Sequence, residues 1–173
     1  MLYLQATRKA IARLGLDREE LPGPGTTDSV LGNWFLNVVP MGGREAYLFM
    51  STRSLLSFPM LIGTLEPGPC DMLLFLEHGI TMLMKSMGIP RSQSSLLLQD
   101  LSELALCRNH DKALIGVYSA IANEYFQRLG HPGNLPKTDI ASVIAATNSA
   151  PRATLDWGNS FEVSRELLAA SVA

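Results

Sequence analysis

Residues 31–51, LGNWFLNVVPMGGREAYLFMS, predict two β-strands joined by a tight turn. Their aromatic side chains, among them Trp34 and Tyr47, suit a pleated and half-buried surface. Gly42 and Gly43 can adopt the positive φ angles that a tight hairpin turn requires. We therefore expect a β-hairpin at the centre of a sheet, with Trp34 and Tyr47 in the core.

Alternating apolar residues predict further strands on both sides of this hairpin. Residues 2–6 have the pattern of an opening strand, after which Thr7 can cap a short helix. Residues 55–62 have the composition of a strand, and Pro59 places it at an edge or a bulge because proline lacks the N–H that a ladder uses. Residues 101–108 alternate again and predict one more strand.

Helical periodicity predicts two long helices in the second half of the chain. Apolar residues recur every three to four positions over residues 70–87, with polar residues on the opposite side, and Gly88 ends the pattern. A second apolar stripe runs over residues 111–129, where Asp111 is a good N-cap. A shorter helix is expected to begin at Ser92.

These elements predict an α+β fold with one domain over residues 1–130. We expect an antiparallel sheet of about four to five strands, with the hairpin at its centre and both long helices packed on one face. Residues 131–173 are predicted to form an appended helical arm, in which Asn159 and Glu162 have the spacing of a capping box. The arm has too few apolar residues to fold alone, so we expect it to pack on the same domain or on a neighbouring subunit.

Composition limits the classes of partner. Of the 173 residues, 47% are hydrophobic and 17% are charged. The charged fraction is below the roughly 25% of average soluble proteins, which leaves apolar surface for a protein partner or a homo-oligomer. The net charge of −2 argues against a nucleic-acid partner, because such proteins are usually strongly basic. No apolar run approaches the roughly 18 residues of a membrane span, and we expect a cytoplasmic protein without membrane contact.

Few residues have the spacing of a catalytic or metal site. The three histidines are isolated, and paired cysteines or helical histidine pairs are lacking, so we expect neither a metal nor a cofactor. Cys107 could be activated by His110, but its apolar neighbours favour a core residue. Cys70 is interpreted similarly, so two buried, reduced thiols are predicted. We predict no catalytic residue.

A basic rim is the best candidate for a binding site. Arg108, His110 and Lys112 lie where a strand passes into a helix, and Arg8 and Lys9 lie at a similar junction near the N-terminus. The first N–H groups of a helix attract anions. These five residues predict a site for a phosphate, a nucleotide or an acidic segment of a partner. The alternative is that the helix is simply capped and the basic side chains are solvated.

The helix over residues 70–87 offers a second kind of surface. It is rich in methionine, with Met72, Met82, Met84 and Met87, and methionine suits adaptable contacts with a partner as well as core filling. Core filling is the plainer interpretation. Because apolar residues extend around much of this helix, we expect it to be covered on more than one side, which a second subunit could provide.

Several motifs together resemble one family. They are Ala6-Thr-Arg-Lys9, the hairpin segments Leu31-Gly-Asn-Trp-Phe-Leu-Asn37 and Arg44-Glu-Ala-Tyr-Leu-Phe-Met-Ser51, and Glu103-Leu-Ala-Leu-Cys-Arg-Asn-His-Asp-Lys112 leading into Leu114-Ile-Gly-Val-Tyr118. The family is the bacterial domain of unknown function six-nine-three-three. The resemblance covers residues 1–129, leaves the C-terminal arm outside, and departs from the family pattern at Arg8 and over residues 109–112. It implies a shared fold and no established activity.

The sequence therefore favours a non-enzymatic protein-interaction or regulatory module from a bacterium. One alternative is a small enzyme that acts on a phosphorylated or anionic ligand at the junction of residues 108–112. Another is an accessory protein of a mobile element or a toxin–antitoxin system. A deep cleft lined by Arg8, His110 and a carboxylate would favour the enzyme, whereas an apolar patch at the arm would favour a protein partner.

Overall fold

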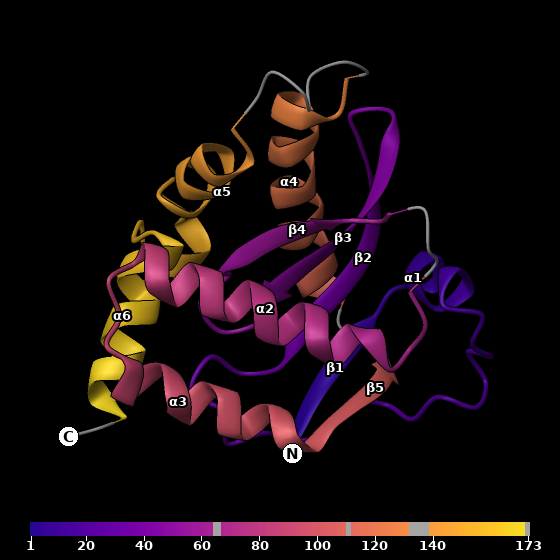
Figure 1. Ribbon diagram of the computed structural model, residues 1–173, viewed down its shortest axis with the longest axis horizontal. Coiled ribbons are helices and arrows are strands. Elements are labelled where there is room, and N and C mark those ends of the chain that lie inside the picture. The colour runs from indigo at the N-terminus through magenta and orange to yellow at the C-terminus, as the bar shows by residue number, and fades with distance from the viewer. Residues whose placement is uncertain (64–66, 110–111, 132–138, 172–173) are drawn as a thin grey trace.

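The predicted hairpin forms the middle of a five-stranded sheet (Figure 1). The computed structural model describes residues 1–63, 67–109, 112–131 and 139–171. Strands β2 (Trp34–Met41) and β3 (Arg44–Ser51) pair antiparallel over their whole length, and Gly42 and Gly43 have φ angles of 60° and 83° in the turn. Trp34 and Tyr47 are buried, so the predicted hairpin and its core residues are confirmed.

The sheet is mixed, so the prediction of a purely antiparallel sheet is wrong. Strands β1 (Leu2–Ala6), β4 (Ser57–Leu61) and β5 (Leu104–Arg108) complete the order β4-β3-β2-β1-β5. Strand β1 is parallel to both β2 and β5, whereas β3 is antiparallel to β2 and β4. The parallel pairing of β1 with β2 and β5 results from the connections between these strands. Long crossovers, the first containing α1 (Arg8–Arg13), return the chain to the same end of the sheet before β2 and before β5.

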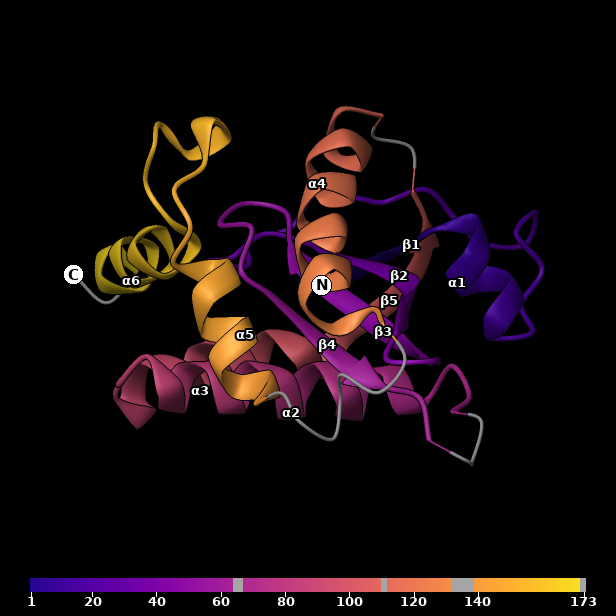
Figure 2. The same ribbon diagram turned by 90° about the horizontal axis from the view of Figure 1, so that it is seen from above.

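Helices cover both faces of this sheet (Figure 2). Helix α2 (Asp71–Ser86) packs in a first apolar cluster with alternate residues of β2, such as Leu36. Helix α4 (Lys112–Leu129) packs in a second cluster with the intervening residues, such as Phe35. The prediction that both helices share one face is therefore wrong. The nearly continuous apolar run of β2 is typical of a strand that is buried on both sides.

The remaining helices surround these layers. They are α3 (Arg91–Asp100), α5 (Ile140–Asn148) and α6 (Ser160–Ala170), with short 3-10 turns η1 (Leu101–Glu103) and η2 (Ala153–Leu155). Asn159 and Glu162 form the predicted capping box at the start of α6. Val143 of α5 joins the second cluster and Leu168 of α6 joins the first, so the C-terminal segment packs here on the sheet of its own chain.

The edge strand β4 is closed by a side chain. The Ser57 N–H donates to Oδ1 of Asn148, and Nδ2 of Asn148 donates to the Ser57 carbonyl, both at 2.8 Å. The amide of Asn148 thus replaces one residue of a neighbouring strand and fixes α5 beside the edge. Two residues on, Pro59 has no N–H to satisfy. Its predicted position in an edge strand is confirmed.

Candidate functional site

The structure brings the predicted basic residues partly together. Because β1 and β5 are parallel and Ala6 pairs with Arg108, the start of α1 and the end of β5 lie at the same end of the sheet. Arg8 follows Ala6 by two residues, and Lys112 begins α4 and is exposed. His110, the remaining member of the predicted rim, lies outside the described residues.

Lys9 forms an ion pair with Glu45 of the hairpin and does not join the other basic residues. Its Nζ lies 3.1 Å from Oε1 of Glu45 in β3, and Nε of Arg13, one helical turn further on, lies 3.2 Å from Oε2 of the same carboxylate. Both pairs are partly exposed, so each stabilises the fold only weakly. They direct Lys9 towards the hairpin and not towards β5.

Cys107 has the properties of a core residue. Its side chain is buried in β5, and Sγ lies 3.7 Å from the carbonyl oxygen of Leu4, to which the thiol donates. Burial raises the pKa of the Cys107 thiol to about 12. A thiol that holds its proton at neutral pH is a poor nucleophile. The expectation of burial is confirmed for Cys107 and wrong for Cys70, which is exposed at the start of α2.

Within the described ranges, no group of three His, Cys, Asp or Glu side chains is placed to hold a metal ion. The helices in that part of the chain are also too short or too polar to cross a membrane. The buried hydroxyls of Tyr118 and Tyr125 bond to main-chain carbonyls of Leu48 and Ser57. Burial raises the pKa of both phenols, so they hold the core together as neutral groups.

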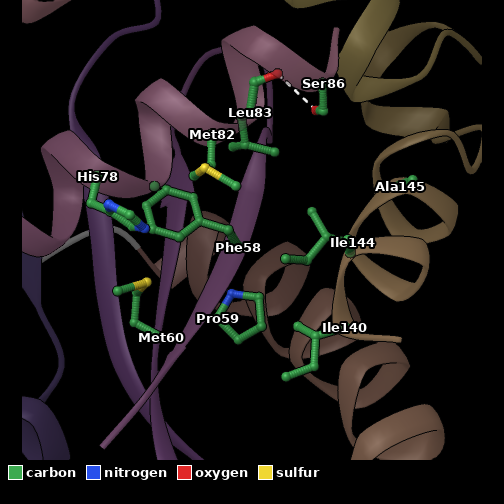
Figure 3. A pocket seen from close by; sticks show the side chains of 12 residues that line it. Phe58, Pro59, Met60, His78, Met82, Leu83, Ser86, Ile140, Ile144 and Ala145 are labelled. Carbon is green, nitrogen blue, oxygen red and sulfur yellow. Dashed lines mark hydrogen bonds between the residues drawn. The ribbon is translucent and has the colours of Figure 1, made fainter. Parts of the chain in front are cut away.

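An apolar pocket of about 270 Å³ opens between β4, α2 and α5 (Figure 3). Three consecutive residues of β4 and two isoleucines one turn apart on α5 form much of its lining. The side chains that define the apolar pocket are Phe58, Pro59, Met60, His78, Met82, Leu83, Ile140 and Ile144.

Close packing of α2 on β4 forms the floor of this pocket. A Cβ at Gly79 would overlap the ring of Phe58, so only glycine lets the helix approach the ring this closely. Phe58 also stacks on Phe49 of β3, with ring centroids 5.1 Å apart. On the opposite side, the bonds between Asn148 and Ser57 fix α5, and with it the wall formed by Ile140 and Ile144.

The polar groups of the pocket are few. Ser86 donates its hydroxyl to the carbonyl of Leu83 at 2.8 Å, within its own helix. The imidazole of His78 lies at the rim beside Phe58 and Met82 (Figure 3). The pocket is therefore suited to bind an apolar group, with one imidazole at its edge to contact a polar neighbour of that group.

Exposed apolar side chains continue from the pocket along α2. Met82 is 54% exposed and Leu74 is 61% exposed, and the two lie eight residues apart with His78 midway. Residues four apart are neighbours on a helix surface. We call Leu74, His78 and Met82 the α2 strip.

Sequence reasoning singled out the methionines of α2 but not the pocket. Met72, Met84 and Met87 are buried as core residues, whereas Met82 lines the pocket. The signal for this difference was the angular position of Met82, which lies off the apolar stripe of the helix. No pattern in one segment could show that β4 and α5 complete the pocket, because their residues are far apart in sequence.

The fold and this site define an α+β protein with an open mixed sheet and an apolar pocket beside one sheet edge. The chain belongs to the family whose model is described as Domain of unknown function (DUF6933), which matches residues 3–163. The predicted family is thus confirmed, and the match continues beyond residue 129 and ends within α6, leaving the end of the arm outside. No curated protein and no solved structure matches the chain.

Proposed function

We propose that this protein is a non-enzymatic interaction module that receives an apolar side chain of a protein partner in the apolar pocket. The observation that carries the proposal is the pocket itself, with its apolar lining and about 270 Å³ of open volume next to exposed Met82. Pockets of this kind bind apolar groups and use a few polar atoms for orientation.

The α2 strip favours a protein segment over a small molecule. Leu74 and Met82 are eight residues apart, which is about 12 Å along the helix axis. A small ligand held in the pocket would leave Leu74 uncovered. A helix or extended segment anchored in the pocket could cover Leu74 as well, because anchors of such segments recur over similar distances.

Charge substitutions test this proposal. Met82→Glu places a carboxylate at the pocket, and we expect it to abolish capture of a stoichiometric partner from the native host, read by mass spectrometry. Ile115→Glu is the matched control, because Ile115 is 44% exposed on α4, on the other face of the sheet. A partner captured equally well by the wild type and by Met82→Glu would contradict the proposal.

Leu74→Glu separates the two classes of ligand. If the occupant is a protein segment, this substitution should weaken binding although Leu74 does not line the pocket. If the occupant is a small molecule, binding should be unchanged. Leu74 is already exposed, so the folded state should tolerate the charge.

A second candidate function is binding or turnover of a phosphorylated or anionic ligand at the basic residues. It is supported by the way the chain leaves two neighbouring parallel strands. After β1 the chain passes to α1, on the sheet face of the first apolar cluster, and after β5 it passes to α4, on the face of the second. Ligands of open α/β sheets often bind where the chain leaves adjacent strands in this way. Charge reversal of Arg108 and Lys112 should then abolish binding of inorganic phosphate, whereas Lys85→Glu on α2 should not. Unchanged phosphate affinity in the doubly reversed variant would exclude this function.

A further inference from the structure

Trp157 is the most exposed of the large apolar side chains in the described residues, at 74%. It lies in the loop of residues 152–158, which joins α5 to α6 and includes η2. We call this segment the Trp157 loop. It stands on the α4 side of the sheet (Figure 2). Single exposed apolar residues are common on folded domains, so a role for Trp157 has to be argued from the way its loop presents it.

The loop holds the main chain at Trp157 in a defined conformation. Asp156 and Trp157 have φ angles of 51° and 66°, a region that costs energy for residues other than glycine. Main-chain bonds close the loop: the Trp157 N–H donates to the Arg152 carbonyl at 3.0 Å, and the Arg152 N–H donates to the Gly158 carbonyl at 3.0 Å. Because the main chain is already ordered, insertion of Trp157 would cost the conformational entropy of its side chain but not that of the loop.

The base of the loop is fastened to the domain. The guanidinium of Arg152 makes a bidentate pair with the carboxylate of Glu124 in α4, at 2.8 and 3.0 Å. It also donates to the carbonyl of Thr147 at 2.8 Å. The Arg152 side chain is nearly buried, so this pair is stronger than a surface ion pair. Helix α5 therefore leads from the pocket wall at its start to a fixed Trp157 loop after its end.

We propose that Trp157 of one copy of this protein inserts into the apolar pocket of a second copy. The inference rests on the proposed function and names the partner as this chain itself. An apolar cavity of about 150 Å³ is large enough to hold benzene. The apolar pocket, at about 270 Å³, has room for the second ring of an indole.

One observation favours a second copy over another protein, and the charge of the chain is compatible with it. The chain carries both an exposed aromatic side chain and an open apolar pocket, and none of the described residues covers the one or fills the other. The net charge of −2 on 173 residues is small, so two copies repel each other only weakly. The His78 imidazole at the rim also lies where it can accept from or donate to polar atoms around an inserted tryptophan.

The surface area that the contact buries limits its affinity. A tryptophan side chain buries about 150–250 Å², whereas specific stable interfaces bury about 1,200–2,000 Å² in total. A single insertion is therefore weak and reversible. Two copies that exchange Trp157 reciprocally, and cover Leu74 and Met82 as they do so, bury more and form a closed dimer. One-way insertion instead gives open chains that grow with concentration.

The experiment is sedimentation of the full chain over a wide range of concentrations. We expect concentration-dependent self-association of the wild type, weakened by about tenfold or more in Trp157→Ala and in Met82→Glu. Both positions are exposed, and Ala at 157 is strained no more than Trp is, so both variants should fold. Ile115→Ala, which removes another exposed apolar side chain, should associate like the wild type.

Mixing the two deficient variants gives the decisive result. Trp157→Ala has an intact pocket and Met82→Glu has an intact tryptophan, so an equimolar mixture keeps one of the two reciprocal insertions. It should therefore associate more strongly than either variant alone and more weakly than the wild type. The emission of Trp157, isolated by subtracting the Trp157→Ala spectrum that contains only buried Trp34, should shift to the blue with association. A wild type that stays monomeric, unchanged association in Trp157→Ala, or a mixture that associates no more strongly than the separate variants would each overturn the inference.

This design separates the inference from the proposed function. If the wild type is monomeric but captures another protein through Met82, self-association is wrong and the interaction module stands. If Met82→Glu changes neither self-association nor partner capture, the apolar pocket is not a docking site and both proposals fail.

Discussion

The two edges of the sheet are closed by different means, and each lies beside one of the two candidate binding surfaces. At β4, the side-chain amide of Asn148 bonds to the N–H and the carbonyl of Ser57. At β5, a main-chain group bonds to the edge instead: the Arg108 N–H donates to the carbonyl of Pro22 at 2.9 Å. The apolar pocket adjoins the first edge and the basic residues adjoin the second.

The difference explains where apolar surface stays open. The side-chain amide of Asn148 bonds to only one residue of the edge, Ser57. Pro59 has no N–H, so it requires no hydrogen-bond acceptor from a neighbouring element. Helix α5 can therefore stand off from the rest of β4, which leaves the pocket between them. At β5, the loop that supplies Pro22 follows the edge, and the thiol of Cys107 beside it is completely buried. The β4 edge is blocked at Ser57 and leaves a cavity beside it, whereas at β5 the bond of Arg108 to the loop lies next to a buried thiol.

The largest effect should come from removing the side-chain closure of β4. In Asn148→Leu the Ser57 N–H loses its partner in a buried setting, while the Ser57 carbonyl still accepts from the hydroxyl of Tyr125 at 3.0 Å. An unsatisfied buried donor together with the lost bonds should lower the free energy of unfolding by about 3 kcal/mol. Denaturant unfolding measures this, and the released edge should also raise the tendency to aggregate.

Asn123→Leu is the control for this substitution. Asn123 is exposed on α4, so the same change of residue type should alter stability by less than about 0.5 kcal/mol. Equal stabilities of the two variants would show that the amide of Asn148 does not close the edge. The position of α5, and with it the wall of the pocket, would then need another explanation.

Local features of this chain could be predicted well from the sequence. The aromatic strands and paired glycines of the hairpin, the Thr7 cap of α1 and the capping box at Asn159 each depend on residues a few positions apart. Their hydrogen bonds and φ angles are determined within one segment, so a pattern in that segment is sufficient.

Long-range features could not be predicted in this way. The parallel pairing of Leu2 with Leu104 depends on crossovers whose direction no single segment specifies. Asn148 closes the edge because the fold places it opposite Ser57, 91 residues earlier, and its own sequence neighbours give no sign of that role. The basic residues were found because they flank helix starts, whereas the pocket was missed because three distant segments share it.

A smaller effect, at the other edge, should appear at high pH. Burial raises the pKa of Cys107 to about 12 in the folded state, whereas an unfolded thiol titrates near about 8.5. Between these values the unfolded chain loses a proton that the folded chain keeps. The contribution of Cys107 to stability is therefore complete below the lower pKa and falls by up to about 1.4 kcal/mol per pH unit above it.

Comparison of the wild type with Cys107→Ala isolates this contribution, because the buried tyrosines titrate equally in both proteins. The difference in unfolding free energy between them should be constant below pH 8 and should shrink as the pH rises further. Thiol labelling of the native Cys70→Ser protein gives an independent measurement, since only Cys107 then remains. If the edge at β5 is filled, Cys107 should react only as fast as the protein unfolds. Rapid labelling of the folded protein would instead show that reagent reaches β5, and the thiol would again become a candidate nucleophile beside the basic residues.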